Sequence, residues 1–192
     1  MLKFRHSICV KGQMYILLSI ALLIIPLPWL TAWVISAAIH EVSHYLALRL
    51  LKVEVISVVI GAAGATINTG PISWKKEVFC ALAGPVGGLL LCLSASWFPR
   101  LALCAMAQSV FNLLPVYPLD GGRAVRCVVL SLFGESVAHT VSVVIGVLCF
   151  IFMISVSVYW ELGVVPILFA FLFGIRYIPI KIPCKHGKQI VQ

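Results

Sequence analysis

The chain has 192 residues, of which 62% are hydrophobic and only 10% are charged. A soluble domain carries about 25% charged and about 45–50% apolar residues, so this composition excludes a soluble globular domain, a disordered tail and a nucleic-acid binder that presents a basic patch. It indicates an integral membrane protein, whose net charge of +8 must then be explained by where the basic residues lie along the chain.

Six apolar segments are long enough, or nearly so, to cross a bilayer, which takes about 20 residues in a helix. The first is short and ends at Pro26 and Pro28, so it either spans or re-enters. A cleaved signal peptide is not expected, because the run 14–38 is longer than the apolar part of such a peptide. The six expected spans cover residues 12–26, 30–51, 78–98, 101–117, 137–158 and 162–178.

The segment Val53–Trp74, between the second and third spans, is rich in β-branched residues and punctuated by glycines. This composition favours a strand hairpin over another helix. The sequence thus predicts an all-α polytopic membrane protein of about six helices with a small β-hairpin at the membrane edge, forming a single domain over residues 1–192.

The basic residues lie almost entirely on one side of the six-span arrangement. Thirteen of the 14 fall at the two termini or in the loops on the same side, and only Arg100 falls opposite. Basic loops stay in the cytoplasm, so both termini are expected there, in a bacterial-type cell membrane. The positive charge is then a topological signal, and no nucleic-acid partner is needed to explain it.

Metal chemistry is indicated first by His40-Glu41-Val42-Ser43-His44, an HExxH motif inside the second expected span. Residues four apart on a helix lie about 40° apart around its axis and about 6 Å apart along it, so both imidazoles can reach one metal ion. Glu41 is placed to take a proton from a water at that metal. Because ionisable residues at bilayer depth are costly, the motif indicates a site rather than a helix-packing cluster.

A third ligand is expected from Asp120, the only aspartate in the chain, which stands before Gly121 and Gly122. A turn or helix-capping role is the alternative for such an aspartate. A straight helix from Leu101 would carry Asp120 too deep, so the segment containing Pro115 and Pro118 would have to bend to bring it to the histidines. Imidazole and carboxylate ligands with one open position are typical of catalytic zinc.

Asn112 has two interpretations. A straight helix would place it at the depth of the histidines, where it could position a substrate, and amide side chains also hold membrane helices together by hydrogen bonds. The seven cysteines are scattered singly without a CxxC pair, so neither a disulfide framework nor a thiolate metal site is expected.

The HExxH motif together with the segment from Asn112 to Arg123 resembles the paired signatures of site-2 proteases, the intramembrane zinc metalloproteases, and especially the branch around stage IV sporulation protein FB. The resemblance implies one zinc ion held by His40, His44 and Asp120, with Glu41 as the general base and Asn112 near the substrate. It also implies a membrane-associated protein substrate, for example a transcription-factor precursor, and a membrane-bound inhibitor or regulator.

The element Ala83–Gly88 resembles the Gly-Pro element of the family's third core helix, with two departures. Gly88 stands where the family often has asparagine, and Ile60 stands where its hairpin commonly has an aromatic residue. Neither a PDZ domain nor the CBS domain of the sporulation branch is expected within residues 1–192.

The sequence therefore predicts a membrane zinc metalloendopeptidase that works by regulated intramembrane proteolysis. Two alternatives remain open at this point. The His-Glu-His cluster could move an ion, as in a transporter or metal carrier, or the chain could be a catalytically silent scaffold that binds membrane clients.

Overall fold

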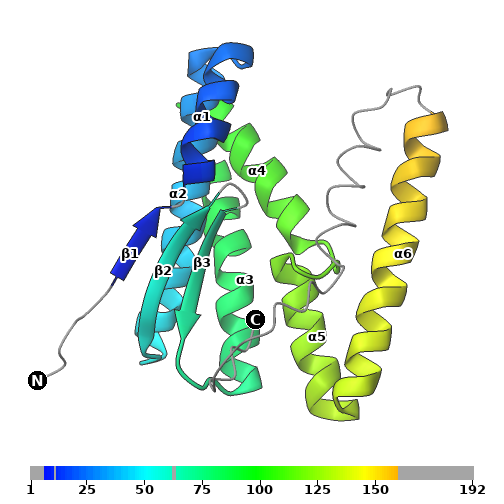
Figure 1. Cartoon of the computed structure of the whole chain (residues 1–192). Helices are drawn as coiled ribbons and strands as arrows, with labels where there is room; N and C mark the ends of the chain where they lie inside the picture. Colours follow the sequence, from blue (N-terminus) through cyan, green and yellow to red (C-terminus); the bar gives the residue numbers. More distant parts are fainter. Residues whose placement is uncertain (1–6, 11, 62–63, 160–192) are drawn as a thin grey trace, which may run out of the picture. The chain divides into compact units, whose positions relative to one another are not determined.

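The computed structural model describes residues 7–10, 12–61 and 64–159 (Figure 1) and falls into two compact units, residues 1–146 and 147–192. The first unit contains every residue named above for the candidate site. The elements in chain order are β1 (Ser7–Val10), α1 (Gly12–Ile24), α2 (Leu27–Leu50), β2 (Val55–Gly61), β3 (Gly64–Thr69), α3 (Trp74–Leu91), the 3₁₀ turn η1 (Cys92–Ser94), α4 (Pro99–Leu113), α5 (Asp120–Phe133) and α6 (Glu135–Tyr159).

Prolines and glycines set several helix boundaries. Pro26 immediately precedes α2, and Pro99 is the first residue of α4; proline is suited to the first turn because its missing N–H has no helical partner there. Helix α4 ends at Leu113, two residues before Pro115. Gly134, at φ +83°, separates α5 from α6, a conformation that glycine adopts without steric cost.

The sheet has three strands in the order β1-β2-β3, which Figure 1 shows side by side. Strands β2 and β3 form the antiparallel hairpin expected from the sequence, with Val59 opposite Thr66. Strand β1 pairs in parallel with β2, with Ser7 opposite Ser57. This third strand was not predicted, because a four-residue strand has too few residues to show an alternating pattern.

A small core fastens the hairpin to the helices. Its buried members are Ala47 and Leu48 at the end of α2, Val55 at the start of β2 and Cys80 on α3. Apolar burial shared by three elements fixes their relative positions. The sheet is therefore held against the end of α2, about one turn after the HExxH motif.

Helices α3 and α4 approach each other closely through small residues. A Cβ at Gly88 would collide with the hydroxyl of Ser109, and Ala105 and Ser109 are both completely buried. Small residues let membrane helices pack backbone against backbone. The glycine at position 88, a departure from the resembled family, thus fits the packing of this chain.

Among the described residues, two helical segments are long and apolar enough to cross a membrane, Trp74–Ser94 and Glu135–Ser157. They overlap the third and fifth expected spans. The first is represented by the shorter α1, the second by α2 and the fourth by the 15-residue α4, while the segment 162–178 lies outside the described residues. The sequence did not predict α5, which the proline-containing turn separates from α4. Six spans remain a prediction.

Candidate metal centre

Three side chains from two distant parts of the sequence converge on one point. His40 Nε2 lies 3.0 Å from Asp120 Oδ2, His44 Nε2 lies 3.2 Å from the same oxygen, and the two Nε2 atoms lie 3.2 Å apart. His40 and Asp120 are buried, and His44 is nearly so. Within the described residues, this is the set of His, Cys, Asp and Glu side chains that could hold a metal ion.

The two histidines meet because they stand one turn apart on α2. Their rings are 4.8 Å apart between centroids and nearly perpendicular, at 83°. Residues at i and i+4 lie on the same face of a helix, so the spacing in the sequence is sufficient to bring the two imidazoles together. The expected pairing of His40 and His44 is thus present in the structure.

Asp120 reaches the histidines because the chain leaves α4 at Leu113 and starts α5 at Asp120 itself. A Cβ at Gly121 would collide with the carbonyl oxygen of Leu113, and one at Gly122 would collide with the backbone of Val116 and Tyr117. The two glycines therefore permit the tight turn that the sequence required if Asp120 was to reach the histidines.

Helix α3 closes the site from the other side. A Cβ at Gly84 would overlap the imidazole of His44 and come within 2.8 Å of His40 Nε2. His44 Nδ1 lies 2.7 Å from the carbonyl oxygen of Cys80, one turn earlier on the same helix. This backbone partner was not found from the sequence, since a carbonyl group carries no sequence signal. The small residues of Ala83–Gly88 were the sequence signal that another element packs closely against this segment.

The hydrogen bond to Cys80 determines what His44 offers to the site. A neutral imidazole has one N–H and one lone pair, and Nδ1 must donate because a carbonyl oxygen can only accept. His44 Nε2 then carries a lone pair and faces an Asp120 oxygen that also carries only lone pairs. Two facing lone pairs 3.2 Å apart repel each other unless a cation lies near both.

The size of the cluster suits zinc. A regular tetrahedron with edges of 3.0–3.2 Å has its centre roughly 1.9 Å from each corner, close to the ≈ 2.0–2.2 Å of Zn–N and Zn–O bonds. Two imidazoles and one carboxylate match the ligand types of catalytic zinc, which leaves one position open. The donor set present therefore fits a zinc ion. His40 Nδ1 is buried without a hydrogen-bond partner among the described residues.

Glu41 lies beside the three ligand atoms but turns toward the hairpin. Its Oε1 accepts a hydrogen bond of 3.2 Å from the backbone N–H of Ala65, at the start of β3. A Cβ at the neighbouring Gly64 would come within 3.3 Å of the same oxygen. The sequence predicted a hairpin near the site, and the structure shows that β3 contacts the carboxylate of the HExxH motif directly.

Asn112 is not bonded to the cluster. Its side-chain nitrogen donates to the carbonyl oxygen of Gln108 on its own helix, at 3.0 Å. The polar link between α2 and α4 is made instead by Gln108, which accepts from the Ser36 hydroxyl at 2.9 Å and donates to the Trp33 carbonyl at 3.1 Å. Sequence reasoning missed Gln108, although a glutamine within an apolar run was the signal that could have identified it.

Comparisons with known proteins point to one kind of protein. No protein-family profile matches the chain. The zinc metalloprotease MJ0392 of Methanocaldococcus jannaschii is 23% identical over 126 residues, which cover 58% of this chain and 37% of that protein. Rip3 of Mycobacterium tuberculosis is 32% identical over 123 residues, covering 53% of this chain and 31% of that protein. Both relatives carry the words zinc metalloprotease in their names.

The chain spans about a third of the length of these curated relatives. Among solved structures, the site-2 protease from Methanocaldococcus jannaschii matches with a TM-score of 0.67 and 16% identity, covering 97% of this chain and 98% of the solved one. At this identity the likeness shows a shared fold. The chain thus has the site-2 protease fold and a cluster of side chains that could bind a metal.

Proposed function

We propose that this protein is an intramembrane zinc metalloendopeptidase of the site-2 protease type. The observation that carries the proposal is the meeting of His40, His44 and Asp120 within 3.2 Å of one another, with Glu41 next to His40 on the same helix. The zinc metalloprotease relatives and the shared fold support it. Placement in the sporulation branch rests only on the spacing of Asn112 and Asp120, and the alignments do not bear on it.

In the proposed reaction, the side chains of His40, His44 and Asp120 hold one zinc ion per chain. When bound, zinc supplies Lewis-acid polarisation of the peptide carbonyl and makes water more acidic. Glu41 accepts the proton that the attacking water loses, and it delivers that proton to the amide nitrogen as the C–N bond breaks. One water is added across the peptide bond, and Glu41 ends as it began.

Backbone groups of neighbouring elements fix the tautomer of His44 and the orientation of Glu41. The Cys80 carbonyl fixes the tautomer of His44, so that Nε2 faces the metal position. The hydrogen bond from Ala65 orients the Glu41 carboxylate through one oxygen, and the second oxygen has no hydrogen-bond partner among the described residues. Glu41 can therefore keep its position while that second oxygen exchanges a proton.

The substrate is proposed to bind as an extended strand along the outer edge of β3, beside which no further strand lies among the described residues. A peptide bond within a helix is shielded and already hydrogen-bonded, so a helical segment must unwind before cleavage. Ala65 points its N–H away from β2 and toward Glu41. By the two-residue period of a strand, Ile67 directs its backbone groups outward as well. A strand paired there would lie alongside Glu41.

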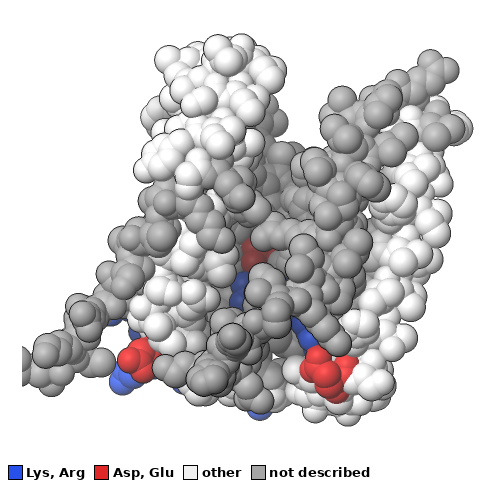
Figure 2. Space-filling model, viewed as in Figure 1, with Lys and Arg blue, Asp and Glu red and all other residues white. Residues whose placement is uncertain are grey.

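The location follows from the apolar helices and the placement of charge. In Figure 2 most coloured side chains gather toward the lower end of the molecule, whereas the end around α1 is white. We infer a single multi-pass membrane domain of about six spans with both termini in the cytoplasm. Its partners are then a membrane-associated protein substrate and, by the resemblance, a membrane-bound inhibitor or regulator.

The decisive test compares the wild-type chain with Glu41→Gln during co-expression with a panel of tagged single-span membrane proteins and membrane-associated transcription-factor precursors. We expect wild type to release a fragment and the variant to lose at least about 100-fold in rate, the lower end of what a general base contributes. The variant should keep its zinc, because glutamine removes the base without removing a ligand. Equal fragment yields from both forms would contradict the proposed activity.

A further inference from the structure

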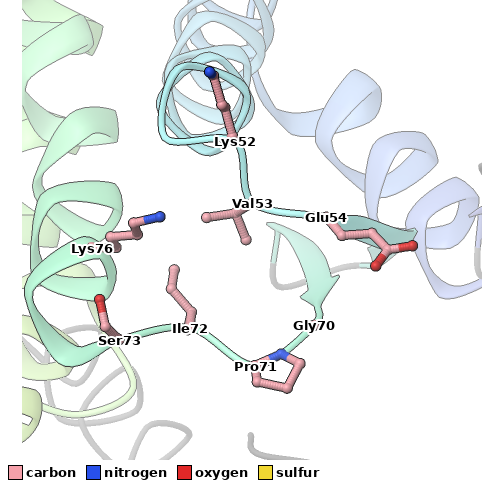
Figure 3. A pocket seen from close by; sticks show the side chains of 8 residues that line it. All are labelled: Lys52, Val53, Glu54, Gly70, Pro71, Ile72, Ser73 and Lys76. Carbon is pink, nitrogen blue, oxygen red and sulfur yellow. The ribbon is translucent and has the colours of Figure 1, made fainter. Parts of the chain in front are cut away.

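A pocket of about 320 Å³ lies away from the metal centre, where the end of α2 meets the start of α3. Figure 3 shows its lining, which comes from the segment that follows α2 and from the segment that leads into α3. The pocket is lined by Lys52, Val53, Glu54, Gly70, Pro71, Ile72, Ser73 and Lys76. Its volume is at the lower limit of ligand pockets, about 300 Å³.

The charge in this pocket is arranged for an anion. In Figure 3 the Lys76 ammonium points into the space between the two segments, whereas the Glu54 carboxylate points away from it. Lys76 Nζ donates to the Leu51 carbonyl oxygen at 3.0 Å, which fixes its position and leaves two of its three N–H donors for a ligand. Lys52 also lines the pocket, but in Figure 3 its ammonium is directed away from this space.

The N-terminus of α3 adds to the preference of the pocket for an anion. Ser73 is the N-cap residue, and its hydroxyl makes no capping hydrogen bond. The first N–H groups of an α-helix lack partners within the helix and carry partial positive charge. An anion in the pocket would therefore meet the Lys76 ammonium, the Ser73 hydroxyl and a helix N-terminus, with the charge of Lys52 nearby.

The apolar residues next to the pocket indicate which kind of anion it would bind. Leu50 and Trp74, each within two residues of a lining lysine or serine, are 78% and 43% exposed. Lys75 Nζ lies 5.5 Å from the centre of the Trp74 ring, an arrangement of aromatic and basic groups typical of a membrane interface. A soluble phosphate would leave these apolar side chains uncovered, whereas a phospholipid would cover them with its acyl chains.

We propose that this pocket binds the phosphate headgroup of an anionic phospholipid at the cytoplasmic surface of the membrane. The site lies outside the metal centre and uses none of the residues assigned to proteolysis. It needs the membrane location but not the catalytic activity, so its failure and the failure of the proposed protease are separate outcomes.

The test measures binding of fluorescent phosphatidylglycerol to the full chain in nanodiscs of phosphatidylcholine. Each lysine near an anionic lipid surface contributes enough attraction that its loss weakens binding about fivefold. We expect Lys52→Gln to weaken binding about fivefold and Lys52→Gln with Lys76→Gln about 25-fold. Lys52→Gln alone keeps the bond from Lys76 to Leu51 intact, and it therefore reports on the pocket even if the double variant folds poorly.

The matched control removes two basic residues on the same side but outside the lining, Arg49→Gln with Lys75→Gln. The proposal expects this control to lose clearly less binding than the double variant in the pocket, and equal losses in both double variants would overturn it in favour of diffuse surface charge. A second arm titrates inorganic phosphate against the bound lipid. Full displacement by millimolar phosphate, with the same sensitivity to Lys52→Gln, would assign the pocket to a soluble phosphate and overturn the lipid source.

Discussion

At the scale of single residues, the metal centre depends on groups that can only accept or only donate. His44 donates from Nδ1 to the Cys80 carbonyl, so its Nε2 and the Asp120 carboxylate both present lone pairs to the same point. When His44 is neutral, neither group can donate a hydrogen bond to the other, so the arrangement favours a cation between them. Glu41 differs from the three ligands, because its carboxylate accepts a hydrogen bond from a backbone N–H and is not bonded to the cluster.

Asp120→Asn removes the one negative charge among the three ligand atoms while keeping the shape of the side chain. We expect zinc affinity to fall by more than about 100-fold, beyond the loss caused by removing an outer hydrogen-bond partner of a ligand. The measurement is zinc per chain by mass spectrometry, after purification and dialysis against a weak chelator. Glu135→Gln, the same carboxylate-to-amide change at an exposed side chain that pairs with Arg126, should leave zinc content unchanged. Wild-type zinc content in the Asp120 variant would contradict its role as a ligand.

At the scale of elements, the site is made by the close approach of helices and strands rather than by one motif. Helix α3 approaches α2 so closely that the Cβ of an alanine at Gly84 or Gly87 would collide with His44 or Ser43. The turn before α5 is equally tight at Gly121 and Gly122. Glycine is used at these positions because the space that a side chain would fill is occupied by His44 or Ser43 in α2, or by the backbone of the segment that precedes α5.

Gly84→Ala tests whether the close packing of α3 against α2 matters to the metal centre. The added methyl group overlaps the His44 imidazole, so either the ring or α3 must move, at a cost of roughly 1–3 kcal/mol in stability. We expect zinc affinity to fall at least tenfold, comparable to disturbing an outer partner of a ligand. Gly12→Ala is the control, because a Cβ there meets nothing within 4 Å. If both variants bound zinc as wild type does, the close packing of α3 would not matter to the site.

The edge of β3 is tested by comparing two substitutions at one position. Ile67→Pro removes the backbone N–H that faces away from β2, whereas Ile67→Ala keeps this N–H and removes most of the side chain. If substrate binds by strand addition, the proline variant should cleave at least about tenfold more slowly than the alanine variant, with both retaining zinc. Initial rates on one tagged substrate give the comparison. Equal rates would show that the substrate does not pair with this part of the edge.

At the scale of the whole molecule, the placement of charge predicts an orientation. Lys52, Lys75 and Lys76 flank the hairpin. The positive-inside rule assigns this side to the cytoplasm and Arg100, at the start of α4, to the opposite side. The proposed protease then receives water and substrate from the side where the hairpin and the lysine pocket lie.

This orientation can be measured with a maleimide that does not cross membranes. Ser96→Cys, in the exposed loop before α4, should be labelled in intact cells, whereas Ser73→Cys should be labelled only after the membrane is opened. The unsubstituted chain reports labelling of the native cysteines and serves as the background. The reverse pattern would invert the proposed topology, and equal labelling of both positions would rule out a span between them.

Much of the site could be predicted from the sequence because its determinants are local. The spacing of His40 and His44 fixes their separation on any α-helix, and Val53–Trp74 carries enough β-branched residues and glycines to indicate a hairpin. The scarcity of charge likewise indicated a membrane protein without any knowledge of the fold.

The tertiary structure decided what depends on contacts between distant segments. Nothing local required Asp120 to turn back to the histidines, made Cys80 the partner of His44, or placed Ala65 against Glu41. The same is true of β1, which pairs with a strand about 50 residues later, and of Asn112, whose amide bonds to its own helix. A helix or a turn is determined by neighbours in the chain, whereas a metal centre is determined by which backbones can approach, and that depends on the packing of the whole fold.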